Sequence, residues 1–132
     1  MKELTEKIKN GEGVIALRTS GGDVRMLSQR GIKPLLELLS EADAPLCGAT
    51  LADKVVGKAA ALLFVYGKVK CVHAMVISEH AKRVLEQSDI VFTYDVLTQK
   101  ILNRDKTGFC PMETKVLEID DPKEAYEVLR SV

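Results

Sequence analysis

The chain has 132 residues, of which 46% are apolar and 29% charged, and its formal net charge is zero. This length suffices for one domain with a buried core, and the balanced charge argues against nucleic-acid or membrane-surface partners, which favour a basic excess. The longest apolar run, residues 59–65, is far shorter than the roughly 20 residues that cross a bilayer, and the odd cysteine number argues against a disulfide framework. We therefore expect a single cytoplasmic domain over residues 1–132.

Apolar spacing in the first half of the chain predicts a helix, a β-hairpin and a second helix. Leu4 and Ile8 share one face of the first helix, and Gly21 and Gly22 provide the tight turn of the hairpin. Pro34 is suited to the first position of the second helix. In order, these predicted elements span residues 2–10, 14–19 with 24–28, and 34–39.

Residues 50–67 are expected to form one central helix around which the fold is built. Thr50 is a suitable N-cap with Asp53 as its acidic partner, and Gly67 is expected to end the helix in a left-handed conformation. Residues 59–65 are apolar on every side, which predicts burial on every side. The polar N-terminal end of this helix would then lie at the edge of the core, where α/β proteins often bind ligands.

The second half of the chain predicts a strand–helix–strand unit with parallel strands, followed by a less regular tail. Ser78 is the expected N-cap of the helix in this unit. Residues 96–102 fit either a helix or an extended segment. The remaining expectations are strands at 69–77 and 90–94, a helix at 79–87, a polar loop at 103–108, a short helix from 110 and a last helix from 121. Together these elements predict a three-layer α-β-α protein with a mixed sheet.

Two stretches resemble the signature sequences of a small bacterial and archaeal family, a domain of unknown function with a cytidine-deaminase-like fold. They are Asp53-Lys54-Val55-Val56-Gly57-Lys58-Ala59-Ala60-Ala61 and Asn103-Arg104-Asp105-Lys106-Thr107-Gly108-Phe109-Cys110-Pro111-Met112-Glu113. The resemblance implies a cytidine-deaminase-like fold over nearly the whole chain. Because deaminase-like domains commonly assemble, it also implies a possible homo-oligomer.

The chain departs from working zinc deaminases at each position that would hold the metal. Those enzymes open the central helix with a His or Cys ligand and a glutamate, and supply two further cysteines after the next strand. Residues 77–81 contain no Cys-x-x-Cys pair, and Cys110 offers a single thiol. The resemblance therefore implies the fold without the zinc chemistry, and we expect neither a metal nor another cofactor.

Polar residues at the expected mouth of the core are the candidate ligand-binding groups. Lys54 and Lys58 would form a cationic pair on one helix face, and Arg104 would clamp a phosphate. Each group also has a purely structural interpretation, as part of a solvated turn, a helix cap or an ordinary polar loop. The candidates are Asp53, Lys54, Gly57, Lys58, Ser78, Glu79, His80, Asn103, Arg104, Thr107 and Gly108.

Cys110 is the candidate nucleophile or sulfur-carrying thiol, with Glu113 one turn away as its base. The alternative is a small buried residue in a turn. Cys71 and His73 share a strand face and conceivably form part of a metal site, although such a histidine is more often hydrogen-bonded at the edge of a core.

These residues support three functions of different classes. The first is a metal-free deaminase-like protein that binds a nucleoside, a nucleotide or another phosphorylated small molecule, with an unknown reaction. The second is a thiol-dependent sulfur- or acyl-transfer enzyme that uses Cys110. The third is an oligomeric or regulatory module without chemistry. We adopt the first and keep the other two as alternatives.

Overall fold

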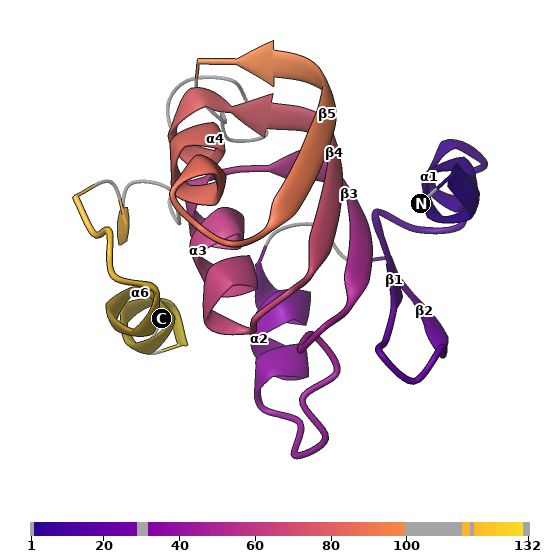
Figure 1. Ribbon diagram of the computed structural model, residues 1–132, viewed down its shortest axis with the longest axis horizontal. Helices are drawn as coiled ribbons and strands as arrows, with labels where there is room; N and C mark the ends of the chain where they lie inside the picture. The colour runs from indigo at the N-terminus through magenta and orange to yellow at the C-terminus, as the bar shows by residue number, and fades with distance from the viewer. Residues whose placement is uncertain (1, 29–31, 100–114, 117, 131–132) are drawn as a thin grey trace.

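The computed structural model describes residues 2–28, 32–99, 115–116 and 118–130. It consists of helices packed around one five-stranded sheet (Figure 1). They are α1 (Lys2–Lys9), β1 (Ile15–Arg18), β2 (Val24–Leu27), α2 (Lys33–Leu39), β3 (Thr50–Val56), α3 (Lys58–Tyr66), β4 (Cys71–Ser78), α4 (Glu79–Glu86), β5 (Val91–Thr98) and α6 (Pro122–Arg130).

The sheet is mixed, with the strand order β2-β1-β3-β4-β5. The hairpin of β1 and β2 is antiparallel, and β1 also pairs antiparallel with β3. β3, β4 and β5 are parallel, and α3 and α4 form the two crossovers between them. The predicted hairpin, the mixed sheet and the parallel strand–helix–strand unit are therefore confirmed.

Helix α3 is the centre of the main core. Every residue from Lys58 to Phe64 is buried, and the helix contacts α2, α4, α6 and β3. Figure 1 shows α3 between the sheet on one side and α6 on the other. The apolar run therefore has the burial on all sides that the sequence predicts.

The opposite face of the sheet carries a smaller apolar cluster beneath α1. Leu4 and Ile8 of α1 pack there against Ala16 of β1 and Ala52 of β3, with Met26 and Met75 at the margin. Helices therefore cover both faces of the sheet, with α1 alone on one face among the described helices (Figure 1).

The expectation of one helix over residues 50–67 is wrong in its first half. Residues 50–56 form β3 in the middle of the sheet, and the helix begins at Lys58. Leu51 and Ala52 are buried on opposite faces of that sheet. This packing between strands outweighs the local helix-capping pattern of Thr50 and Asp53. Gly67 is not in a left-handed conformation either, since its φ is −78°. The left-handed residue after α3 is Lys68, with a φ of 62°.

The third parallel strand is longer than the sequence predicts. β5 continues to Thr98, which settles the open choice at residues 96–98 in favour of an extended chain. The other described elements lie within a few residues of their predicted positions, including the last helix, α6. Among the described residues, no helix has the length and apolar character needed to cross a membrane.

Removing the Phe64 ring should destabilise the fold strongly, because its side chain is 0% exposed at the centre of α3. Phe64→Ala is expected to lower the free energy of unfolding by about 3–5 kcal/mol. Chemical denaturation measures this loss. The matched control is Val65→Ala on the same helix, where the side chain is only half-buried. Equal losses in the two variants would contradict the burial pattern of α3.

Candidate functional site

The carboxyl ends of the parallel strands bring several of the predicted site residues to one edge of the sheet. Val56 of β3 lies beside Ile77 of β4, and Ser78 lies beside Thr98 of β5. Gly57 and Lys58 follow β3 directly, and Glu79 and His80 follow β4. Open α/β sheets bind ligands outside this edge. The structure therefore groups Gly57, Lys58, Ser78, Glu79 and His80 in the position where a ligand is expected.

Lys58 is the first residue of α3, and its charged side chain is largely buried. The side chain is 8% exposed, and its Nζ lies 3.1 Å from Oδ1 of Asp120, whose side chain is 89% exposed. A cation at the N-terminal end of a helix opposes the helix dipole, and its burial costs solvation. Both penalties favour an anion close to this ammonium.

Gly57 is the N-cap residue of α3 and provides no side-chain cap. Its backbone is extended, with φ −99° and ψ −179°, a conformation that any residue adopts. The N-terminal end of α3 therefore carries both the ammonium of Lys58 and the positive end of the helix dipole.

Asp53 lies on the central strand with its carboxyl on the side of the main core. Its partners across the sheet, Ile15 and Ala74, belong to β1 and β4 and are buried. Burial raises the pKa of the Asp53 carboxyl to about 8, although hydrogen bonds from the backbone of Val55 and Lys54 lower it in part. At pH 7 this carboxyl is therefore mostly protonated and can donate a hydrogen bond.

A break in strand alternation follows Asp53. The N–H of Val55 donates to Oδ1 of Asp53 over 3.3 Å, and the side chain of Val55 is 42% exposed whereas that of Val56 is 0% exposed. Strict alternation would bury Val55 on the same face as Asp53. The alternation shifts by one residue between Asp53 and Val56, which places Val56 in the core immediately before Gly57 and α3.

Lys54 does not pair with Lys58 on one helix face as the sequence predicts. It is an exposed residue of β3, whereas Lys58 begins α3, so the two belong to different elements. The carboxyl of Asp53 accepts hydrogen bonds from the backbone of Val55 and Lys54, whereas Lys58 forms an ion pair with Asp120.

Ser78 acts as the N-cap of α4, as the sequence predicts. Its Oγ accepts a hydrogen bond from the N–H of Ala81 at 3.1 Å, and the residue is fully buried. Glu79 and His80 form the first turn of α4 and are half-buried. Ser78 therefore has a structural role here, and Glu79 and His80 remain the residues at this edge with accessible polar atoms.

The remaining predicted site residues lie outside the described part of the chain. This holds for the candidate nucleophile and its base, Cys110 and Glu113, and for the polar loop. The residues concerned are Asn103, Arg104, Thr107, Gly108, Cys110 and Glu113. Their roles stay predictions.

Two hollows in the described structure border helices of the main core. The smaller, of about 160 Å³, lies between α3, α4 and the start of α6, and Asp120 and Pro122 form part of its wall. The larger, of about 400 Å³, lies between α2 and the end of α6. Neither is lined by Asp53, Gly57 or Ser78, so Asp120 alone connects a hollow with the candidate site.

His73 is held by two residues of β5 that the sequence did not single out. Its Nδ1 lies 2.7 Å from Oγ1 of Thr93, and its Nε2 lies 3.3 Å from Oδ1 of Asp95. The register of β4 and β5 brings these groups together, and local sequence pattern does not show which residues of two strands joined by a crossover helix lie opposite each other. Among the described residues, no three His, Cys, Asp or Glu side chains are placed to hold a metal ion.

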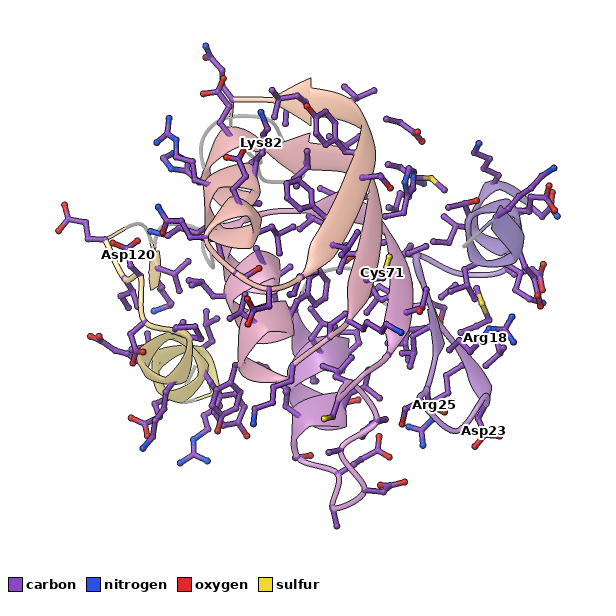
Figure 2. All side chains as sticks on the ribbon, viewed as in Figure 1. Arg18, Asp23, Arg25, Cys71, Lys82 and Asp120 are labelled. Atoms are coloured by element: carbon purple, nitrogen blue, oxygen red, sulfur yellow. The ribbon has the colours of Figure 1, made fainter. Side chains whose placement is uncertain are left out.

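Asp120 is the site residue that sequence reasoning missed most clearly. It contacts Lys58 from the segment before α6, which packs against α3 in the fold but is remote in sequence. Figure 2 shows Asp120 next to the start of α6, on the side that faces α3 and α4. Its position two residues before Pro122 suggested only the start of a helix.

Comparisons with known proteins place the chain in a family of unknown function. The family model described as TM1506, a domain of unknown function (DUF1893), matches residues 3–132. The fold is similar to the crystal structure of a DUF1893 family protein (TM1506) from Thermotoga maritima, with 32% sequence identity and a TM-score of 0.85. That match covers 99% of this chain and 90% of the other. No curated protein matches the chain.

The raised pKa of Asp53 should make folding stability depend on pH. The carboxyl has a pKa of about 8 in the folded chain against an ordinary 3.8, so the unfolded chain loses this proton first. The Asp53 contribution is therefore fully present below about pH 4 and is lost as the pH rises to about 8, by up to about 1.4 kcal/mol per pH unit.

The variant Asp53→Asn keeps the acceptor oxygen and cannot ionise, so it should lack this part of the pH dependence. Denaturant unfolding of both proteins between pH 5 and pH 8 measures the difference. Asp89→Asn, at an exposed position, should retain the wild-type slope. Identical slopes for Asp53→Asn and the wild type would show that Asp53 is ionised in the folded chain.

Proposed function

The chain belongs to the DUF1893 family, and we propose that it binds an anionic small molecule of the nucleoside or nucleotide type at the carboxyl edge of β3 and β4. The anionic group would contact Lys58 and the N-terminal end of α3. We assign no reaction to this site.

The proposal includes a cytidine-deaminase-like classification of the fold. The order of elements supports it, because an antiparallel β1–β2 hairpin pairs with β3, and α3 and α4 then connect the parallel strands β3, β4 and β5. Gly57 and Lys58 begin α3, the helix at the centre of the main core.

The observation that carries the proposal is the buried ammonium of Lys58 at the head of α3. A lysine there favours a nearby anion, because the helix dipole and the loss of hydration both act against an isolated positive charge. One partner of this ammonium, Asp120, has a side chain that is 89% exposed, so the carboxylate of the pair is open to solvent. A ligand phosphate would add a stronger anion beside the same ammonium.

Nearby polar groups supply the means to recognise the rest of such a ligand. Glu79 and His80 are half-buried at the start of α4, on the neighbouring strand end. A carboxylate and an imidazole are suited to bind ribose hydroxyls or the edge of a base. The polar residues of the 103–108 loop stay predicted contributors, with Arg104 as the expected phosphate clamp.

A thermal-shift panel tests the proposal with defined probes: inorganic phosphate, the four ribonucleoside 5′-monophosphates and the corresponding nucleosides. A probe at a hundred times its Kd should add roughly 2.7 kcal/mol to the free energy of unfolding and raise the Tm by several degrees. We expect a nucleotide to give a larger shift than its nucleoside, because the phosphate binds at Lys58.

Two lysine variants make this test specific. Lys58→Met keeps the aliphatic stem without the charge, and it should remove the shift caused by the nucleotide. Lys54→Met removes an exposed lysine four residues earlier, and it should leave the shift unchanged. The proposal fails if no probe stabilises the wild type, or if Lys58→Met and the wild type respond equally.

A further inference from the structure

β5 forms one edge of the sheet and exposes an unusual amount of apolar surface. It pairs with β4 on one side, and no described strand pairs with its other side. Most of the large hydrophobic residues that the described structure exposes lie on this strand: Val91 (66%), Tyr94 (37%), Val96 (53%) and Leu97 (40%). Figure 1 shows β5 at the end of the sheet opposite to the hairpin.

Several features that usually prevent edge-to-edge pairing are missing from β5. Protein edges are commonly short, bulged, or interrupted by lysine or proline. β5 has eight residues, contains neither lysine nor proline, and pairs with β4 from Val91 to Tyr94 and again from Val96 to Thr98. The other edge strand, β2, has only four residues and carries Arg25.

From these observations we propose that β5 is an interface for a second copy of this chain, which pairs antiparallel with it around a twofold axis at Tyr94. The two five-stranded sheets would then form one continuous ten-stranded sheet. This inference is independent of the proposed ligand site, which lies at the carboxyl edge of β3 and β4.

The backbone directions on β5 agree with that axis. The N–H of Val91 donates to the carbonyl of Lys70, so it points toward β4. Backbone groups alternate along a strand, which turns the N–H and C=O groups of Phe92 and Tyr94 to the outer edge. With the axis at Tyr94, each Tyr94 exchanges both hydrogen bonds with its copy, and Phe92 does the same with Val96 of the second copy.

The side-chain sequence of β5 is self-complementary about the same residue. The axis at Tyr94 places Val91 opposite Leu97 and Phe92 opposite Val96, so that apolar residues face apolar residues. Thr93 faces Asp95, which gives the carboxylate a hydroxyl partner in place of a like charge. Such cross-strand pairs are the unit that stabilises a sheet.

Neighbouring registers lack this complementarity. An axis at Asp95 would place the two carboxylates directly opposite each other, a repulsive pair. An axis at Thr93 would place Val91 opposite Asp95, an apolar side chain against a charge. The sequence of β5 therefore selects the register centred on Tyr94.

Side chains on both sides of β5 are already held in place within one copy. The ring of Tyr94 stacks against Phe92 at 6.5 Å, and Nζ of Lys82 lies 5.9 Å from the centre of the Tyr94 ring. Figure 2 shows Lys82 on α4, next to β5. On the other face, Asp95 is fixed by its contact with His73. A rigid edge loses little conformational entropy on pairing.

The mass of the full chain in solution tests the interface, measured by light scattering coupled to size-exclusion chromatography over a concentration series. The wild type should approach twice the 14.5 kDa mass of one chain. Val96→Lys places a charge on the pairing edge and should give a monomer with an unchanged circular dichroism spectrum. Val24→Lys makes the same change at an exposed valine of β2 and should remain a dimer.

Disulfide trapping tests the register in a background where Cys47, Cys71 and Cys110 are replaced by serine. Tyr94→Cys should form a cross-linked dimer on oxidation, because a hydrogen-bonded antiparallel pair has its Cα atoms about 5.5 Å apart. Val91→Cys, at the most exposed apolar position of the strand, should not cross-link, because the two copies of that residue would be roughly 20 Å apart.

Either experiment can overturn the proposal. A wild-type chain that stays monomeric at every concentration, or a dimer that survives Val96→Lys and dissociates in Val24→Lys, excludes β5 as the interface. Cross-linking of Val91→Cys at a rate equal to that of Tyr94→Cys excludes the register centred on Tyr94.

Discussion

The burial of α3 on every side is the constraint from which the rest of the described fold follows. Because this helix has no polar face beyond its first residue, it must be enclosed by the sheet and by other helices at once. Leu35 of α2, Leu85 of α4 and Leu129 of α6 all belong to the core that surrounds it. The chain therefore assembles three further helices on the same face of the sheet and leaves only α1 among the described helices for the other face.

The same constraint places two ionisable groups in the interior, and each avoids an isolated buried charge in a different way. The carboxyl of Asp53 becomes neutral by keeping its proton, as its pKa of about 8 implies. The ammonium of Lys58 keeps a counter-ion, since Asp120 reaches it from the segment before α6. We therefore propose ligand binding at Lys58, whereas Asp53 keeps a fixed proton in the folded chain.

The sequence predicted the parts of this fold that depend on local pattern and missed those that depend on tertiary pairing. The hairpin, the cap at Ser78 and the burial of residues 59–64 were predictable, because glycine pairs, capping residues and apolar runs act over a few residues. The strand at 50–56 was read as helix, because the polar residues Asp53 and Lys54 mimic a helix start and only the neighbouring strands reveal the central position. The contacts of Lys58 with Asp120 and of His73 with Thr93 and Asp95 require the register and packing of distant segments.

The most direct test of the account is an amide NMR titration of the full chain with the nucleoside monophosphate that gives the largest thermal shift, with inorganic phosphate as the reference probe. The account predicts saturable shifts for the amides of Gly57, Lys58 and Ala59 at the head of α3, accompanied by Glu79 and His80 when the probe carries a nucleoside. It is contradicted if these amides remain unperturbed at saturation, or if the shifts concentrate on the β1–β2 hairpin or on the hollow between α2 and α6.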